Sequence, residues 1–257
     1  MKKKGQITIF IIVAIVIIVF IALFFIFQNK IIKPNNFGSS EKINPENFLK
    51  ICIENKVEET IQTLSYQGGY IKNSLNTGFQ FENEPYWNIS YLCYTSANSL
   101  PCVIQQPSII NYMEKEITEE IKGDLESCFD DLILNYKEEN YDVINNYNNF
   151  NSDLIEDKLI INLDAELTLT KSGESIRKKD FKIEFPTKLY NLGEITQKII
   201  EKEAKFNYFD YIDYMFFNPD YIINLKSMDD QTKIYTLENI KTKEKFRFAT
   251  RGAVLSS

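Results

Sequence analysis

Residues 158–170, KLIINLDAELTLT, alternate between apolar and polar side chains over most of their length. The apolar members are Leu159, Ile161, Leu163, Ala165, Leu167 and Leu169. Successive side chains of a strand point to opposite faces of a sheet, so this period of two predicts a strand with one buried face. Ser172-Gly173 follows as a turn and the alternation returns over 176–185, which together predict a β-hairpin.

Helix signals lie mainly before this hairpin, and strand signals lie mainly after it. Amphipathic helices are predicted from Asn44 to the Gly68-Gly69 pair, over 108–136 and over 192–206. Further strands are predicted over 69–71, 87–95, 221–225, 233–238 and 245–249. Because helices and strands are grouped along the chain instead of alternating, we predict an α+β domain with an antiparallel sheet.

The first two helices each carry an apolar stripe at spacings of three and four residues, which is typical of a helix with one buried face. The first stripe consists of Leu49, Cys52, Ile53, Val57, Ile61 and Leu64. The second consists of Ile110, Met113, Ile117, Ile121, Leu125, Cys128, Leu132 and Tyr136. Both stripes include a cysteine, so packing the two helices together would bring two sulfurs to the same seam.

The opposite face of the second helix is acidic, with ten carboxylates and three lysines between Glu114 and Glu139. It either binds a cation or a partner, or it is simply solvated, and we favour the solvated interpretation. Asparagines then crowd residues 140–151, which we interpret as a loop or junction. We therefore divide the domain into a helix-rich, disulfide-bonded part, 44–150, and a part with β-hairpins and helices packed on it, 151–257.

The N-terminus carries an apolar run of 21 residues, 7–27, in which Thr8 is the only polar side chain. With a rise of about 1.5 Å per residue it forms a helix of roughly 31 Å, which matches the hydrocarbon core of a bilayer. A removable signal has a shorter apolar region, of about 7–15 residues, followed by small residues. Here the run ends in bulky side chains, so residues 1–28 are predicted to be a basic leader and a permanent transmembrane helix.

Charge and turn residues indicate how this helix is connected. Lys2, Lys3 and Lys4 precede it and fewer lysines follow it, which favours a cytoplasmic N-terminus and an extracytoplasmic domain. Residues 29–43 contain Pro, Gly, Ser and Asn and are predicted to be a linker. Asn88-Ile89-Ser90 is a glycosylation sequon, which is compatible with an outer face.

Four cysteines, Cys52, Cys93, Cys102 and Cys128, all follow the apolar run, and an even number in an exported chain suggests disulfides. Cys52 and Cys128 lie on the two helix stripes, and Cys93 and Cys102 flank a short segment able to close as a loop. We predict the pairs Cys52–Cys128 and Cys93–Cys102, the alternative being four free thiols. The chain has no histidine and no Cys-x-x-Cys pair, so we expect no metal site or cofactor.

The residues Lys2-Lys3-Lys4-Gly5-Gln6-Ile7-Thr8-Ile9-Phe10, with the apolar helix after them, resemble the start of archaeal type IV pilin-like precursors (class III signal peptides). In that family a short basic leader ends at glycine and is cut off before the helix, which remains on the mature protein. The resemblance implies a cut between Gly5 and Gln6. Many pilins carry glutamate at the fifth mature position, where this chain has Phe10, and this departure counts against filament assembly.

No catalytic motif is present. Without histidine the chain has neither a Ser-His-Asp nor a Cys-His arrangement, and it lacks nucleophile-elbow, phosphate-loop and dinucleotide-binding glycine patterns. The acidic pairs Asp130-Asp131 and Asp229-Asp230 are interpreted as a helix surface and a hairpin turn, not as acid–base pairs. The net charge of −7 excludes a broad basic surface for nucleic acid. We expect a protein that is not an enzyme.

Aromatic residues are concentrated in 207–221, with candidate binding residues Tyr208, Tyr211, Tyr214 and Tyr221. Exposed rings would stack on sugars or grip a peptide, with Asp210, Asp213, Asn218 and Asp220 as polar neighbours. The alternative, which we favour, is that the rings fill the seam between a short helix and the sheet.

These features indicate a single-pass membrane protein of the cell surface whose external domain contacts envelope proteins, glycans or other extracellular components. Its other predicted partner is membrane lipid. A pilin-like subunit that forms a homo-oligomer or filament is the first alternative, and an anchored hydrolase or ligand-binding protein is the second.

Overall fold

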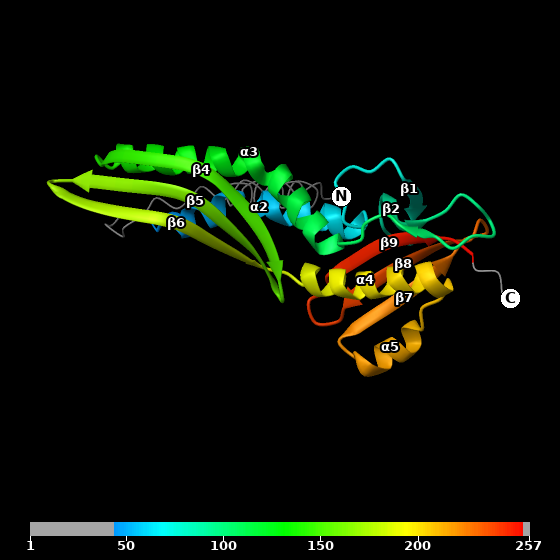
Figure 1. Ribbon diagram of the computed structural model, residues 1–257. Helices are drawn as coiled ribbons and strands as arrows, with labels where there is room; N and C mark the ends of the chain where they lie inside the picture. The colour runs from blue at the N-terminus through cyan, green and yellow to red at the C-terminus, as the bar shows by residue number, and fades with distance from the viewer. Residues whose placement is uncertain (1–43, 254–257) are drawn as a thin grey trace, which may run out of the picture. The chain divides into compact units, whose positions relative to one another are not determined.

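The computed structural model describes residues 44–253, which form an α+β domain with four helices and two sheets (Figure 1). The chain divides into two units between Ile43 and Asn44. The predicted leader and transmembrane helix (1–28), the linker (29–43) and the cut between Gly5 and Gln6 lie outside the described residues. No helix within 44–253 is long and apolar enough to cross a membrane.

The two long helices begin where the sequence predicts. Helix α2 (Pro45–Tyr66) starts after Asn44, whose side-chain oxygen accepts hydrogen bonds from the backbone N–H groups of Glu46 and Asn47. This arrangement satisfies donors that the first helical turn leaves free. Helix α3 (Ile109–Glu138) starts after Ser108 and buries the predicted stripe except Ile110, which is half-buried.

Both predicted disulfides are present. Cys52–Cys128 joins α2 to α3 with a Cα–Cα distance of 5.9 Å, and Cys93–Cys102 closes a short loop with a Cα–Cα distance of 5.2 Å. The described residues contain no free cysteine. An ion pair between Lys56 Nζ and Glu120 Oε1, 2.6 Å apart, adds a second link between the two helices.

The predicted hairpin forms the centre of a three-stranded antiparallel sheet in the order β4-β5-β6. Strand β5 (Lys158–Lys171) pairs with β6 (Glu174–Pro186) through the Ser172-Gly173 turn, and its six alternating apolar side chains are all buried. Their face of the sheet packs against the helices, as the contact of Phe129 on α3 with Phe181 on β6 shows, with ring centroids 6.1 Å apart.

The asparagine-rich segment is a strand, so its interpretation as a loop is wrong. Strand β4 (Asp142–Ile155) pairs with β5 along its whole length, and the boundary predicted at residue 150 falls inside it. A bulge between Tyr147 and Asn149 inserts one extra residue. The insertion breaks the period of two, with Tyr147 before it and Phe150 after it, and this hides the strand in the sequence.

Helix α3 protects the outer edge of β4. Glu114 Oε1 accepts the backbone N–H of Leu154 at 2.8 Å, and Thr118 Oγ1 accepts that of Ser152 at 3.2 Å. Glu116 similarly accepts the N–H of Ile71. The interpretation of the acidic face as solvated is therefore wrong for three carboxylates. Glu114 and Glu116 accept hydrogen bonds from backbone N–H groups, and Glu120 pairs with Lys56.

The second sheet is mixed and has six strands. Its order is β1 (Asn76–Gln80), β2 (Tyr86–Tyr94), β9 (Lys245–Arg251), β8 (Thr232–Asn239) and β7 (Tyr221–Ser227), with β3 (Val103–Ile104) paired to β2. Strands β2 and β9 are parallel, so the prediction of a purely antiparallel sheet is wrong. The predicted strand over 69–71 is a bend, because Gly68 and Gly69 both have positive φ.

Helix α4 (Leu189–Phe206) lies on one face of this sheet, and the short helix α5 (Tyr211–Phe217) lies beside β7 (Figure 1). The opposite face packs a second apolar cluster around Ile89, Tyr91, Ile234 and Ala249. Helices α2 and α3 cover the three-stranded sheet, and α4 covers the six-stranded sheet.

Removing the two disulfides should destabilise the domain unequally. Cysteine pairs separated by 76 and 9 residues restrict the unfolded chain differently, and chain entropy assigns about 4–5 kcal/mol to the long loop and about 2–3 kcal/mol to the short one. We expect the free energy of unfolding to fall more for Cys52→Ala/Cys128→Ala than for Cys93→Ala/Cys102→Ala. Urea denaturation under non-reducing conditions measures the difference, and equal losses would contradict the prediction.

Candidate functional site

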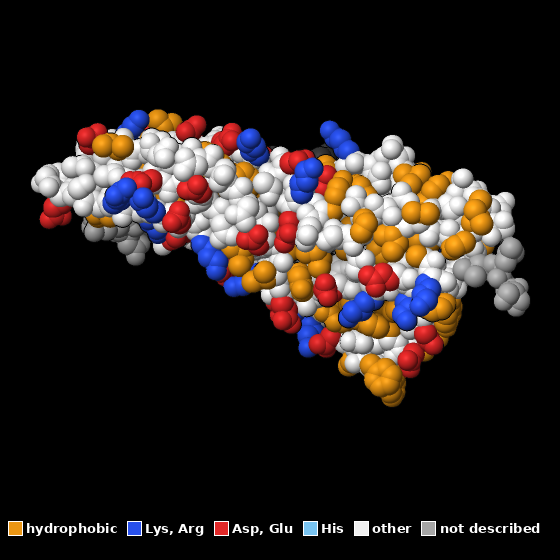
Figure 2. All heavy atoms as spheres, viewed as in Figure 1, with side chains coloured by type: hydrophobic (Ala, Val, Ile, Leu, Met, Phe, Trp, Pro, Cys, Tyr) orange, Lys and Arg blue, Asp and Glu red, His pale blue; other side chains and the backbone are white. Residues whose placement is uncertain are grey.

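Exposed aromatic and aliphatic side chains gather around α5 and the end of α4. The exposed fractions are 50% for Phe206, 61% for Tyr208, 66% for Ile212, 79% for Phe216 and 70% for Phe217. We call these five residues the aromatic patch. Figure 2 shows hydrophobic side chains at the surface over α4 and α5, with lysines and carboxylates between them. Contiguous exposed apolar surface is typical of interaction sites.

Local turns bring the patch together. Asn207, in the left-handed conformation with φ 51°, ends α4 and reverses the chain. Asp210 then caps α5 by accepting the backbone N–H of Asp213 at 3.0 Å, and Asn218 ends α5 by donating from its side chain to the carbonyl of Tyr214. The backbone N–H of Ile223 on β7 lies 3.1 Å from Met215 Sδ, which fixes α5 against the sheet edge.

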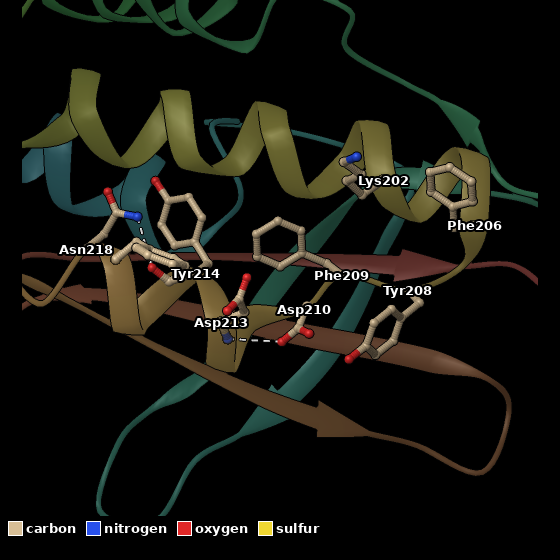
Figure 3. Close-up of a pocket in the computed structure, with 9 residues that line it drawn as sticks. Lys202, Phe206, Tyr208, Phe209, Asp210, Asp213, Tyr214 and Asn218 are labelled. Atoms are coloured by element: carbon tan, nitrogen blue, oxygen red, sulfur yellow. Dashed lines mark hydrogen bonds between the residues drawn. The ribbon is translucent and has the colours of Figure 1, made fainter.

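A pocket of about 410 Å³ opens between α4 and α5 (Figure 3). Phe209 is buried and points toward α4 (Figure 3). Its ring packs on that of Tyr214 of α5, with ring centroids 5.6 Å apart. The pocket combines aromatic rings with polar side chains, and its lining consists of Lys202, Phe206, Tyr208, Phe209, Asp210, Asp213, Tyr214, Phe217 and Asn218.

The structure brings together only part of the predicted site. Tyr208 and Tyr214 line the pocket, whereas Tyr211 and Tyr221 do not. Tyr214 is half-buried. Burial raises the pKa of its hydroxyl, and the nearby Tyr221 and Glu194 raise this pKa further. The seam interpretation fits Phe209, which is buried, but not Tyr208, Phe216 and Phe217, which are exposed; a binding role for these exposed rings stays a prediction.

The prediction missed Phe206, Ile212 and Lys202. The sequence signal for Phe206 was its position at the end of a helix, directly before the aromatic segment. No pattern in the sequence distinguishes the outward-facing Ile212 from a core residue, since α5 has only 7 residues and makes too few turns to show a stripe.

The acidic pairs do not form a catalytic arrangement. Asp130 and Asp131 are exposed on α3, and Asp230 accepts the backbone N–H of Thr232 in the turn between β7 and β8. No group of three or more potential metal ligands converges within 44–253. Asn88 of the sequon lies on β2 and is exposed, whereas Ser90 is buried.

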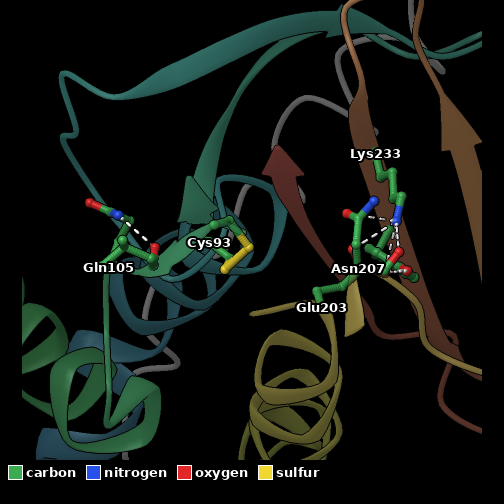
Figure 4. Close-up of a disulfide and its surroundings, with 8 residues drawn as sticks. Cys93, Gln105, Glu203, Asn207 and Lys233 are labelled. Atoms are coloured by element: carbon green, nitrogen blue, oxygen red, sulfur yellow. Dashed lines mark hydrogen bonds and ion pairs between the residues drawn. A yellow bond between two sulfur atoms is a disulfide. The ribbon is translucent and has the colours of Figure 1, made fainter. Parts of the chain in front are cut away.

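A buried ionic cluster supports the end of α4 (Figure 4). Glu203 is 1% exposed and accepts hydrogen bonds from Lys233 Nζ at 2.8 Å and from the Tyr235 hydroxyl at 2.7 Å. Lys233 also donates to the backbone carbonyl and side-chain oxygen of Asn207. Burial and the adjacent Glu203 raise the pKa of Tyr235, which keeps it protonated as a donor. The cluster joins α4 to β8 at Asn207, which lies between Phe206 and Tyr208 of the patch.

A buried cation lies on the other face of the sheet. Arg247 on β9 is 1% exposed and pairs with Glu84 through both terminal nitrogens, at 2.9 Å from NH2 to Oε1. Its guanidinium also lies over the rings of Phe81 and Tyr66, 4.0 and 4.8 Å from their centroids. Such contacts fasten the 81–84 loop and the end of α2 to the sheet. Neither buried cluster opens into the pocket.

Comparisons with protein families, with curated proteins and with solved structures found no match.

Truncating a buried ring of the site should lower the free energy of unfolding much more than truncating an exposed one. Phe209→Ala removes a buried ring and should lower the free energy of unfolding by about 3–5 kcal/mol. Phe216→Ala removes an exposed ring and should change it by less than about 0.5 kcal/mol. Chemical denaturation monitored by circular dichroism compares the two, and a large loss for Phe216→Ala would mean that this ring belongs to the core.

The Arg247–Glu84 pair should make stability depend on pH. Hydrogen bonding to Arg247 lowers the pKa of Glu84 below its value in the unfolded chain, despite partial burial. The pair therefore stabilises the fold fully above the unfolded pKa of about 4.3, and the contribution is lost as the pH falls through the lower, folded value. We expect the stability difference between the native protein and Glu84→Gln to shrink on acidification below about pH 4. A difference that is constant from pH 7 to pH 3 would contradict this.

Proposed function

We propose that this chain is a membrane-anchored, extracytoplasmic surface protein that is not an enzyme and that contacts an envelope or extracellular component through the aromatic patch. The observation that carries the proposal is the exposure of five large apolar side chains on α4, α5 and the loop between them. Burying such side chains against a partner removes apolar area from water, which favours association.

The location is supported by the cysteines and by the N-terminal sequence. Two disulfides and no free thiol in the described residues fit an oxidising compartment. The apolar run at 7–27, with lysines before it, has the length and flanking charge of an anchor whose N-terminus is cytoplasmic.

The position of the patch within the domain fits this role. The chain enters the domain at α2, whose start pairs with the three-stranded sheet through Glu46 and Lys178, 2.8 Å apart. The end of α2 reaches the six-stranded sheet, where Tyr66 stacks on Trp87 with ring centroids 4.6 Å apart. A helix of 22 residues is roughly 33 Å long. The patch lies on α4, α5 and the loop between them, over the six-stranded sheet, whereas the start of α2 lies beside the three-stranded sheet (Figure 1).

A pilin-like subunit is the second candidate, because Gly5-Gln6 stands at the boundary between the basic leader and the apolar run. In that case the mature protein would begin at Gln6 and would assemble through its N-terminal helix. Phe10, in place of the glutamate found in many pilins, makes this the weaker candidate.

Protease treatment of intact cells, followed by N-terminal sequencing of the mature protein, tests both candidates. We expect external protease to remove the domain while leaving a membrane-bound fragment, and we expect the native protein to fractionate as a single-pass membrane protein. A domain that is protected in intact cells, or a full-length protein recovered from the cytosol, would overturn the proposal. A mature start at Gln6 together with filaments in electron micrographs would favour the pilin-like subunit instead.

A further inference from the structure

We propose that the pocket between α4 and α5 binds a neutral carbohydrate. This inference rests on the proposed function, since it names the chemical class of the component that the aromatic patch contacts.

The apolar part of the pocket suits the faces of sugar rings. Phe206, Tyr208 and Phe217 line it and expose half or more of their surface, while Phe209 and Tyr214 form its packed base. Figure 3 shows that the Phe206 ring comes from the end of α4 and the Tyr208 ring from the loop after it, with Tyr208 beside Asp210. Flat aromatic faces offer stiff apolar surface at little cost in side-chain entropy, which suits the C–H face of a pyranose.

The polar part of the pocket supplies hydrogen-bond acceptors. Asp210 uses one oxygen to cap α5, and the carboxylate of Asp213 has no hydrogen-bond or ion-pair partner among residues 44–253. An ionised carboxylate accepts several hydrogen bonds and donates none. Its complement is a ligand rich in donors, and the adjacent hydroxyl groups of a sugar fit this requirement.

The charges around the pocket disfavour an anionic ligand. Asp210 and Asp213 repel an anion, and Lys202 in the lining offsets only one of these two negative charges. Lys202 and Lys205 also lie 5.5 and 5.0 Å from the ring centroid of Phe206, so the cation–π capacity of this ring is already used. A purely apolar peptide segment would bury the two carboxylates without hydrogen-bond donors, which is costly.

Lipid is a poorer occupant than carbohydrate. Anionic headgroups attract lysine-rich surfaces, whereas this pocket carries two carboxylates and one lysine. A glycan of the envelope or of a neighbouring surface is therefore the occupant we assign.

The test uses the full-length protein in lipid nanodiscs that contain no glycolipid, prepared without sugar-headed detergents because these would compete. The probes are immobilised neutral hexose and N-acetylhexosamine oligosaccharides, with uronic-acid oligosaccharides and an apolar peptide in parallel. We expect binding to at least one neutral oligosaccharide. Tyr208→Ala and Asp213→Asn should each weaken it about three- to tenfold through loss of one stacking face or one charged acceptor.

Tyr86→Ala is the matched control, because this tyrosine is 64% exposed on β2 and does not line the pocket. It should leave binding unchanged, and circular dichroism should show that all variants remain folded. Absence of binding to every neutral oligosaccharide would overturn the inference, as would preference for the acidic oligosaccharides or the peptide, or affinity unaffected by Tyr208→Ala. If these results appear while protease still removes the domain from intact cells, the assignment of the ligand fails and the proposed function stands.

Discussion

The burial of one face of β5 is the constraint on which the rest of the structure depends. Six alternating apolar side chains along this strand must be removed from water, and the paired helices α2 and α3 cover them. This requirement holds the helix pair together, and the Cys52–Cys128 bond fastens it. The same pair supports both sheets, since the start of α2 pairs with β6 and its end stacks on β2. The aromatic patch then rests on the second sheet, where the Glu203–Lys233 pair holds α4 in place.

Local patterns in the sequence were sufficient for much of this fold. The hairpin of β5 and β6, the starts of α2 and α3, the strands β7 to β9 and both disulfides could be predicted, because each depends on periodicity, capping residues or helix faces within a short window. The edge strand β4 could not, because one bulged residue shifts its alternation and its outward positions are asparagines. The parallel pairing of β2 with β9 joins residues such as Tyr91 and Ala249, which are far apart in the sequence, and leaves no local trace.

The candidate site was predictable as a composition but not as a surface. The density of rings over 207–221 was evident, yet only the fold decides that Phe209 turns inward while Phe216 and Phe217 face solvent. The acidic face of α3 shows a similar limit. Its charge suggested a solvated surface, but Glu114 and Glu116 bind backbone N–H groups, because the path of the chain places free donors beside them.

The Cys52–Cys128 bond also determines how mechanical load would pass through the protein. A pull applied at Asn44 and resisted at the patch crosses from α2 to α3 through the two sulfurs, so the chain between them carries no tension. Strands β1, β2 and β3 lie within that shielded loop. Beyond Cys128 the load follows the backbone through β4, β5 and β6, which neither disulfide spans. In this part of the chain, extension is resisted by the antiparallel pairing of three strands and not by a covalent cross-link.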